Sequence, residues 1–428
     1  MATFTAPASG YDSVLVIGGG IAGITAALEA AELGHEVFLI EKTPYLGGRV
    51  AQLARYFPKL CPPTCGIEIN LRRLRDNPRV HLFTSAEVSA IDGGPGAFDV
   101  RVTVEPRYVN DRCTACGQCV DTCPVERPNA YNYGMDTTKA IYIGHEMAYP
   151  MKYAIDDETC LGETCGRCVA ACPYGAIDLA MQAQSVSLQV GAVVVATGWK
   201  PYDASAIVNL AFGHYPNVVT NVMLERMAAD TGPTAGQIAR PSDGRPVNRV
   251  AFIQCAGSRD RLHLPYCSGI CCLGSLKQAT YILDRNPDAE VYVYYIDLRT
   301  PGTYEVFADR VMADPHVHPI KGKVADILWD DESGDLSVVA DDMVAGRMSR
   351  VPVDLVVLAT GMEPSLSQNR PAMPAAFDEH GFVLDTGEDR GIYAAGCARE
   401  PMDVATATMD ATAAAMMAVR SIRKSTVR

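Results

Sequence analysis

Two runs of cysteine give this chain its most distinctive chemistry. The first has the spacing Cys-x2-Cys-x2-Cys-x3-Cys-Pro from Cys113, and the second has Cys-x4-Cys-x2-Cys-x3-Cys-Pro from Cys160. In paired runs of this kind, each run supplies three thiolates to one [4Fe–4S] cluster and its last cysteine to the other. Thiolate sulfur suits such clusters, and short spacings let one loop wrap three corners. The predicted ligand sets are Cys113, Cys116, Cys119 and Cys172 for the first cluster, and Cys160, Cys165, Cys168 and Cys123 for the second.

The second run departs from the usual spacing, because four residues (161–164) stand where two are usual. The longer segment widens one loop and removes no ligand. A pair of zinc sites or disulfides is the simpler alternative. Zinc is satisfied by four cysteines, whereas here two interlocked sets each end in Cys-Pro, so the pattern favours clusters.

Residues 14–41 have the pattern of a strand, a glycine turn, a helix and a second strand. The turn carries G-x-G-x-x-G, formed by Gly18, Gly20 and Gly23. These glycines permit a tight turn and the close approach of a pyrophosphate, which the N–H groups of the helix N-terminus can bind. Glu41 follows the last glycine by eighteen residues. It is placed to accept hydrogen bonds from the adenosine ribose, and its charge disfavours a 2′-phosphate.

The segment Tyr-Leu-Gly-Gly-Arg at 45–49 favours FAD over NAD. With it the chain resembles the two-domain FAD proteins of the thioredoxin-reductase superfamily. These share a Gly-Gly turn beside the flavin, an Ala-Thr-Gly after a later strand, and a glycine–acid pair near the C-terminus. Here Ala-Thr-Gly occurs at 196–198 and 359–361, and cysteine stands where the family often has the acid. The further FAD-binding residues implied by the resemblance are Lys42, Gly47, Gly48, Arg49, Ala196, Thr197, Gly198, Gly396 and Cys397.

The predicted fold class is therefore α/β, a two-domain Rossmann-like flavoprotein of thioredoxin-reductase type with an inserted ferredoxin-like 2[4Fe–4S] module. The insertion is expected between a β-meander and a later strand of the FAD domain. The predicted divisions are a loose tail (1–10), the first part of the FAD domain (11–107), the inserted module (108–180), a return strand and connector (181–230), a second nucleotide-binding-like domain with extra cysteines (231–355) and the C-terminal part of the FAD domain (356–428).

The second domain lacks a glycine fingerprint after its expected first strand, 249–254. Cysteines occupy that place, so direct binding of a nicotinamide cofactor is disfavoured. LGGR, the inserted double-cluster pattern, RPSDG, FIQCAGSRD and YCSGICC together resemble the flavin subunit of heterodisulfide reductase and its relatives. This resemblance implies a third [4Fe–4S] cluster, with scattered buried thiols as the alternative. The implied ligands are Cys255, Cys267, Cys271 and Cys272.

The segment KLCPPTCG at 59–66 most resembles the corresponding flavin subunit of the quinone-interacting membrane-bound oxidoreductases of sulfate reducers. That resemblance implies a homologous flavin/iron–sulfur partner, a haem-bearing membrane subunit that handles menaquinol, and adenylylsulfate reductase as electron partner. Cys61 and Cys65 lie near the expected flavin ring. They are candidates for a redox pair or for cluster ligands, and the two prolines between them equally suit a structural loop.

Composition excludes other classes. The formal charge of −13 over 428 residues argues against non-specific nucleic-acid binding. No apolar run approaches the ~18–20 residues that cross a bilayer, so membrane association is expected only through a partner protein. The first ten residues lack the pattern of a signal peptide. We therefore expect a cytoplasmic protein, held at the inner face of the membrane by its complex.

These features predict an electron-transfer flavoprotein subunit, in which a flavin exchanges electron pairs for the single electrons that clusters carry. The main hypothesis links the menaquinone pool to adenylylsulfate reductase in sulfate reduction. Alternatives are the flavin subunit of a soluble, bifurcating or non-bifurcating heterodisulfide reductase, and an NAD(P)H-dependent disulfide or ferredoxin reductase. A scaffold that uses clusters only to fold or to sense oxygen is the alternative outside catalysis.

Overall fold

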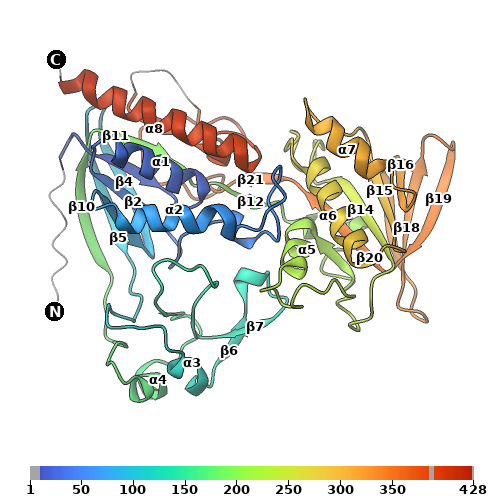
Figure 1. Ribbon diagram of the computed structural model, residues 1–428, viewed down its shortest axis with the longest axis horizontal. Coiled ribbons are helices and arrows are strands. Elements are labelled where there is room, and N and C mark those ends of the chain that lie inside the picture. Colours follow the sequence, from blue (N-terminus) through green and yellow to red (C-terminus); the bar gives the residue numbers. More distant parts are fainter. Residues whose placement is uncertain (1–9, 385–389, 427–428) are drawn as a thin grey trace.

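The computed structural model of this chain describes residues 10–384 and 390–426, so the predicted tail, apart from Gly10, lies outside the described residues. The chain forms two α/β domains and an inserted module, which lies beside the first domain and reaches toward the second (Figure 1). Among the described helices, none has both the length and the hydropathy of a membrane span.

The first domain is built on a parallel sheet in the order β22-β11-β1-β2-β3. Its strands are nearly continuous apolar runs because both faces of the sheet are covered. Helices α1, α2 and α8 cover one face, and an antiparallel sheet in the order β10-β5-β4 packs on the other (Figure 1). The bounds are β1 (Val14–Ile17), α1 (Ile21–Glu32), β2 (Val37–Glu41), α2 (Thr64–Asp76), β3 (Val80–Thr84), β4 (Ala86–Gly94), β5 (Ala97–Val104), β10 (Gln184–Val190), β11 (Ala192–Val195), β22 (Ile392–Ala394) and α8 (Val404–Thr426).

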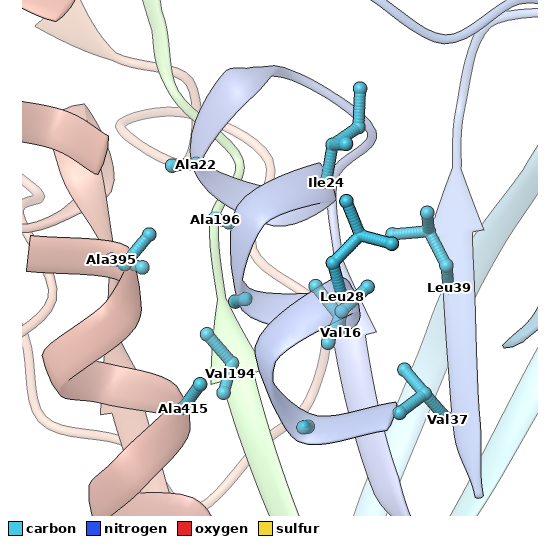
Figure 2. Packing of buried hydrophobic residues seen from close by; sticks show 14 of the residues in the cluster. Val16, Ala22, Ile24, Leu28, Val37, Leu39, Val194, Ala196, Ala395 and Ala415 are labelled. Atoms are coloured by element: carbon cyan, nitrogen blue, oxygen red, sulfur yellow. The ribbon is translucent and has the colours of Figure 1, made fainter. Parts of the chain in front are cut away.

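The packing around α1 positions the glycine turn. Leu28 of α1 lies over Val16 of β1 and Leu39 of β2, and Ala415 of α8 faces Val194 of β11 (Figure 2). Burial of a side chain such as Leu28 contributes about 2 kcal/mol. The small alanines of α1 and α8 let the two helices approach closely, so the N-termini of both helices are held at the same edge of the sheet.

The inserted module follows β5 and ends at β10, which are antiparallel neighbours. The insertion was expected after the meander, but the structure places it inside, because β10 is the third meander strand. A bridge between Val109 and Ile177 closes the module where both ends return. Its elements are α3 (Gln118–Thr122), β6 (Glu126–Pro128), β7 (Thr137–Lys139), β8 (Ile141–Tyr142), β9 (Ala154–Ile155) and α4 (Arg167–Ala171).

The second domain has a parallel sheet in the order β13-β20-β14-β15-β16 and a smaller antiparallel sheet, β17-β18-β19. A two-stranded ribbon of β12 and β21 joins it to the first domain. The bounds are β12 (Trp199–Pro201), β13 (Val218–Thr220), α5 (Asn221–Ala228), β14 (Arg249–Ala256), α6 (Cys271–Arg285), β15 (Glu290–Tyr295), α7 (Tyr304–Met312), β16 (Val317–Lys321), β17 (Val324–Trp329), β18 (Leu336–Asp342), β19 (Arg347–Val353), β20 (Leu355–Thr360) and β21 (Met362–Pro364).

The second domain extends beyond the range expected from the sequence, 231–355. Strand β13, helix α5 and strand β20 belong to it, and the Pro/Gly-rich segment 231–246 lies within it, between α5 and β14. The expected first strand, β14, is instead the centre of its sheet. The boundary was missed because β13 is only three residues long and is stabilised by pairing with β20, which is distant in the sequence.

Candidate functional site

The three glycines of the turn after β1 have different structural tasks. A Cβ on Gly18, whose φ is +108°, would lie 2.3 Å from the Ala196 carbonyl oxygen, and a Cβ on Gly23 would lie 1.7 Å from the Gly18 carbonyl oxygen. These two glycines therefore let strand, turn and helix pack closely. A Cβ on Gly20 would meet only the Gly48 Cα, at 3.9 Å. Gly20 thus leaves open space at the N-terminus of α1, where a pyrophosphate would bind.

A cavity of about 1230 Å³ opens at this edge of the sheet and receives walls from both domains and from the module. Its size suits a ligand larger than a typical drug molecule. Three of the predicted FAD-binding glycines do not line the cavity: Gly23, Gly47 and Gly396. The predicted FAD-binding residues that line it are Gly18, Gly20, Glu41, Lys42, Gly48, Arg49, Ala196, Thr197, Gly198 and Cys397.

Glu41 ends β2 with its carboxylate fixed at the cavity. One oxygen accepts a hydrogen bond from the Gly19 N–H at 2.6 Å, and the other accepts from the Thr43 N–H at 2.7 Å and hydroxyl at 2.8 Å. Burial raises the pKa of Glu41, and these hydrogen bonds act in the opposite direction. The residues present fit the adenosine half of FAD, whose ribose hydroxyls could share this acceptor.

Arg49 joins the first domain to the module at the cavity. Its Nη1 donates to the Tyr133 hydroxyl at 3.0 Å and to Gln52 at 3.1 Å, while its Nε donates to the Trp199 carbonyl at 3.3 Å. Lys42 is exposed and pairs with Glu87 at 2.6 Å. Arg49 is therefore a positioned cation, whereas Lys42 contributes mainly surface charge.

The N-terminus of α8 reaches the cavity through Asp403 and Val404. Burial raises the pKa of Cys397 to about 11, so this residue is a neutral thiol at physiological pH. The aspartate in this region that sequence reasoning missed is Asp410. It accepts a hydrogen bond from the Gly396 N–H at 2.8 Å and pairs with Arg399 at 2.7 Å.

A buried ion pair of the second domain also lines the cavity. Lys277 of α6 lies 2.8 Å from Glu225 of α5, and both side chains are about 5% exposed or less. Glu225 also accepts from Gln278 at 2.6 Å and Tyr281 at 3.2 Å, and Lys277 donates to the Arg55 carbonyl at 2.7 Å. No motif pointed to this pair. The available signal was the pair of polar residues, Lys277 and Gln278, on the buried side of an otherwise amphipathic helix.

The module gathers its eight cysteines around two small cavities, one on each side of Ile141. The members of each set match the two ligand sets expected from the interlocked spacing, although ligation itself remains a prediction. Gly117 and Gly166, at φ +90° and +56°, start the short helices α3 and α4 that carry Cys119 and Cys168. The first cavity is lined by Cys113, Cys116, Cys119 and Cys172, and the second by Cys123, Cys160, Cys165 and Cys168.

Backbone N–H groups point at several of these sulfurs. Ala115 donates to Cys113 at 3.5 Å, Ala176 to Cys172 at 3.3 Å, and Gly162 to Cys160 at 3.4 Å. Such bonds stabilise sulfur that carries negative charge and tune cluster potentials. Within the described residues, no three His, Cys, Asp or Glu side chains are grouped as for a single metal ion.

The third cysteine set lies at the carboxyl end of β14 and the start of α6. Burial raises the pKa of Cys255, and the nearby Cys272 and Cys267 act in the same direction. Burial likewise raises the pKa of Cys271, with smaller effects from the other three cysteines. Cys271 also lines the large cavity. The four candidate ligands thus come from the end of β14, the loop after it and the start of α6, and Cys271 reaches the predicted FAD site.

Cys61 and Cys65 lie just before α2 and in its first turn. Cys61 pairs in an isolated bridge with Tyr56, and Cys65 is exposed in the first turn of α2. Neither lines the large cavity. A redox or ligand role for this pair stays a prediction.

Comparison with known families agrees with both cofactor sites. Residues 13–59 match the family described as FAD dependent oxidoreductase, and residues 112–176 match the 4Fe-4S dicluster domain. Two thioredoxin reductases have the same fold at 14% identity. That of T. acidophilum has a TM-score of 0.52 over 97% of this chain and 99% of its own. That of Lactococcus lactis has a TM-score of 0.53 over 96% and 99%. The predicted fold class is confirmed.

Curated relatives are more similar in sequence. The chain is 39% identical over 420 residues to an iron-sulfur subunit of the CoB–CoM heterodisulfide reductase of Methanocaldococcus jannaschii, covering 94% of this chain and 63% of that protein. It is 37% identical over 417 residues to the equivalent subunit of the ferredoxin/F(420)H(2)-dependent CoB-CoM heterodisulfide reductase of Methanosarcina acetivorans, covering 94% and 52%. The chain thus spans between half and two thirds of these relatives. Over its matched length, the chain is therefore similar to subunits of heterodisulfide reductases.

Proposed function

We propose that this chain is the FAD and iron–sulfur electron-transfer subunit of a heterodisulfide-reductase-type complex. One observation carries the proposal: a thin wall separates the predicted FAD cavity from the cysteine-lined cavities. Ile141 of β8 lines both cysteine cavities, and its neighbour Tyr142 lines the large cavity. Ile155 of β9 lines the second cysteine cavity, and the next residue, Asp156, lines the large cavity.

The bound FAD would supply exchange between electron pairs and single electrons, and the clusters would carry single electrons. The chain's own residues bind and orient these groups. Gly20 leaves room for the pyrophosphate, Glu41 would accept from the ribose, and the neutral Cys397 thiol adds no charge of its own beside Asp403. Lys277, held by Glu225, keeps an ammonium proton at Nζ on the cavity wall, where a reduced ligand could receive it.

The electron source is proposed to be a protein partner rather than NAD(P)H. Where a nicotinamide-binding domain has its glycine turn, this chain has Cys255 at the end of β14. We propose that Cys255, Cys267, Cys271 and Cys272 hold a third cluster there, next to the flavin. Rapid bleaching of the bound flavin by NADH or NADPH would contradict this proposal.

The relatives are named as subunits, so partner subunits are proposed for this chain as well. They favour the heterodisulfide reductase reading over the narrower one with menaquinone, a haem-bearing membrane protein and adenylylsulfate reductase. The narrower reading rests only on the resemblance of residues 59–66.

Anaerobic purification from the native source tests both the electron-transfer role and the kind of complex. We expect one FAD and two or three clusters per chain, together with co-purifying subunits. Disulfide-reductase subunits would support the proposal, and a haem-bearing membrane protein would instead support the narrower reading. FAD without inorganic sulfide would refute the electron-transfer role.

A further inference from the structure

Arg107 is a charged residue that the electron-transfer chemistry above does not use. It lies where the chain leaves β5 and enters the module, and it is less exposed than a surface arginine. Its Nε donates to the Tyr153 carbonyl at 3.1 Å, its Nη1 to the Thr84 hydroxyl at 3.1 Å, and its Nη2 to the Pro44 carbonyl. Its guanidinium lies 4.8 Å from the centre of the Tyr45 ring. All of these partners are neutral.

No described carboxylate forms an ion pair with Arg107. A charge removed from water is costly unless an opposite charge or strong hydrogen bonds compensate it. Burial lowers the pKa of Arg107, and the charges that act against this effect are those of Tyr45, Tyr142 and Cys113. The hydrogen-bond partner Tyr153 lines the first cysteine cavity, together with Cys113, Cys116, Cys119 and Cys172. The group able to supply a lasting negative charge on this side of Arg107 is therefore the predicted first cluster.

We propose that Arg107 is the counter-charge of the cluster held by Cys113, Cys116, Cys119 and Cys172, and that it raises the reduction potential of this cluster above that of its neighbour. The inference rests on the proposed function, because it needs the clusters. A cluster with four thiolates is anionic and gains a further negative charge on reduction. A nearby cation therefore favours the reduced form, and the effect is strong in a site of low dielectric.

Among the described residues between the second cysteine cavity and the large cavity, no charged side chain lacks an opposite charge as Arg107 does. Arg127 lies 4.4 Å from the centre of the Tyr142 ring, but Asp156 pairs with it at 3.0 Å. This pair has no net charge. Exposed charges near the module, such as Arg112, are screened by water and salt. Apart from exposed residues such as Arg167, which lies between Cys165 and Cys168, the surroundings of the two clusters therefore differ by the charge of Arg107.

The test is a redox titration, followed by electron paramagnetic resonance, of anaerobically purified protein. In Arg107→Gln we expect the equilibrium constant for reduction of one cluster to fall about tenfold, a shift of about 59 mV for one electron. Arg107→Lys keeps the charge, so most of the wild-type potential should be retained. Comparison with Cys165→Ser, which perturbs the second cluster, assigns the signal.

The neutral pair offers a matched control. The double variant Arg127→Gln/Asp156→Asn removes no net charge, so neither potential should move selectively. Equal shifts of both clusters in Arg107→Gln, or no shift, would overturn the inference. Loss of iron in Arg107→Gln but not in Arg107→Lys would support it, whereas loss in both would show that the hydrogen bonds matter instead. Wild-type protein without iron and sulfide would refute the proposed function itself. Wild-type protein with both clusters but without the Arg107 effect would refute only this inference.

Discussion

At the scale of single residues, Gly20 differs from the other glycines of its turn because its Cβ position is open. Alanine at this position should leave folding intact, since a Cβ meets only Gly48 at 3.9 Å. It should weaken FAD binding at least tenfold, because the methyl group fills the space for the pyrophosphate. Titration of apoprotein with FAD measures the change. Gly94→Ala is the control, because its Cβ meets nothing within 4 Å.

Cys397 provides a second residue-scale prediction, on pH dependence. Only the thiolate reacts with iodoacetamide. With a pKa of about 11, the thiolate fraction of Cys397 rises about tenfold for each pH unit between pH 7 and 10. We expect slow labelling at pH 8 that accelerates in this way, while the exposed Cys65 is labelled first. Mass spectrometry of peptides gives both rates, and a pH-independent rate at Cys397 would contradict the neutral-thiol assignment.

At the scale of elements, α5 and α6 are joined by the buried pair of Glu225 and Lys277. Lys277→Met leaves a buried carboxylate without its partner and should cost about 3–5 kcal/mol of unfolding free energy. The double variant Glu225→Gln/Lys277→Met should recover much of this loss, because no unpaired charge remains. Urea denaturation followed by circular dichroism measures both. A double variant no more stable than the single one would contradict the ion-pair explanation.

The elements also show what sequence patterns can predict. The strand–turn–helix–strand unit at 14–41 was predicted nearly to the residue, because its apolar periodicity and glycines are local signals. The eight module cysteines were grouped correctly from spacing, since each run folds as one loop. Strand β13 was missed because its pairing is long-range. Glu225, Lys277 and Arg107 were missed for the same reason: their hydrogen-bond and ion-pair partners lie 23 or more residues away in the chain.

At the scale of the whole molecule, Arg226 of α5 connects all three parts. Its Nε donates to Asn132 of the module at 2.8 Å, its Nη1 donates to the Gln52 carbonyl of the first domain at 3.3 Å, and its guanidinium lies 4.8 Å from the Tyr131 ring centre. The side chain is only 2% exposed. It therefore helps to hold the walls of the FAD cavity together.

Arg226→Met should loosen these contacts without removing a cofactor ligand. We expect earlier proteolysis within 108–180 and faster FAD release, both in the same variant, because one contact network supports both. Arg226→Lys, which keeps the charge but has a single nitrogen to reach these partners, should be intermediate. Timed digestion and flavin fluorescence provide the two readouts. Faster proteolysis with unchanged FAD release would show that the module is not needed to retain the flavin.

The module and the second domain enter and leave the first domain in the same manner. The module begins and ends at paired strands β5 and β10, and the second domain begins and ends at paired strands β12 and β21. Each insert is thus flanked by a pair of antiparallel strands. The hydrogen bonds between these strands keep the two ends of the insert adjacent. Either insert could therefore be replaced by another of different length without disturbing the parallel sheet of the first domain.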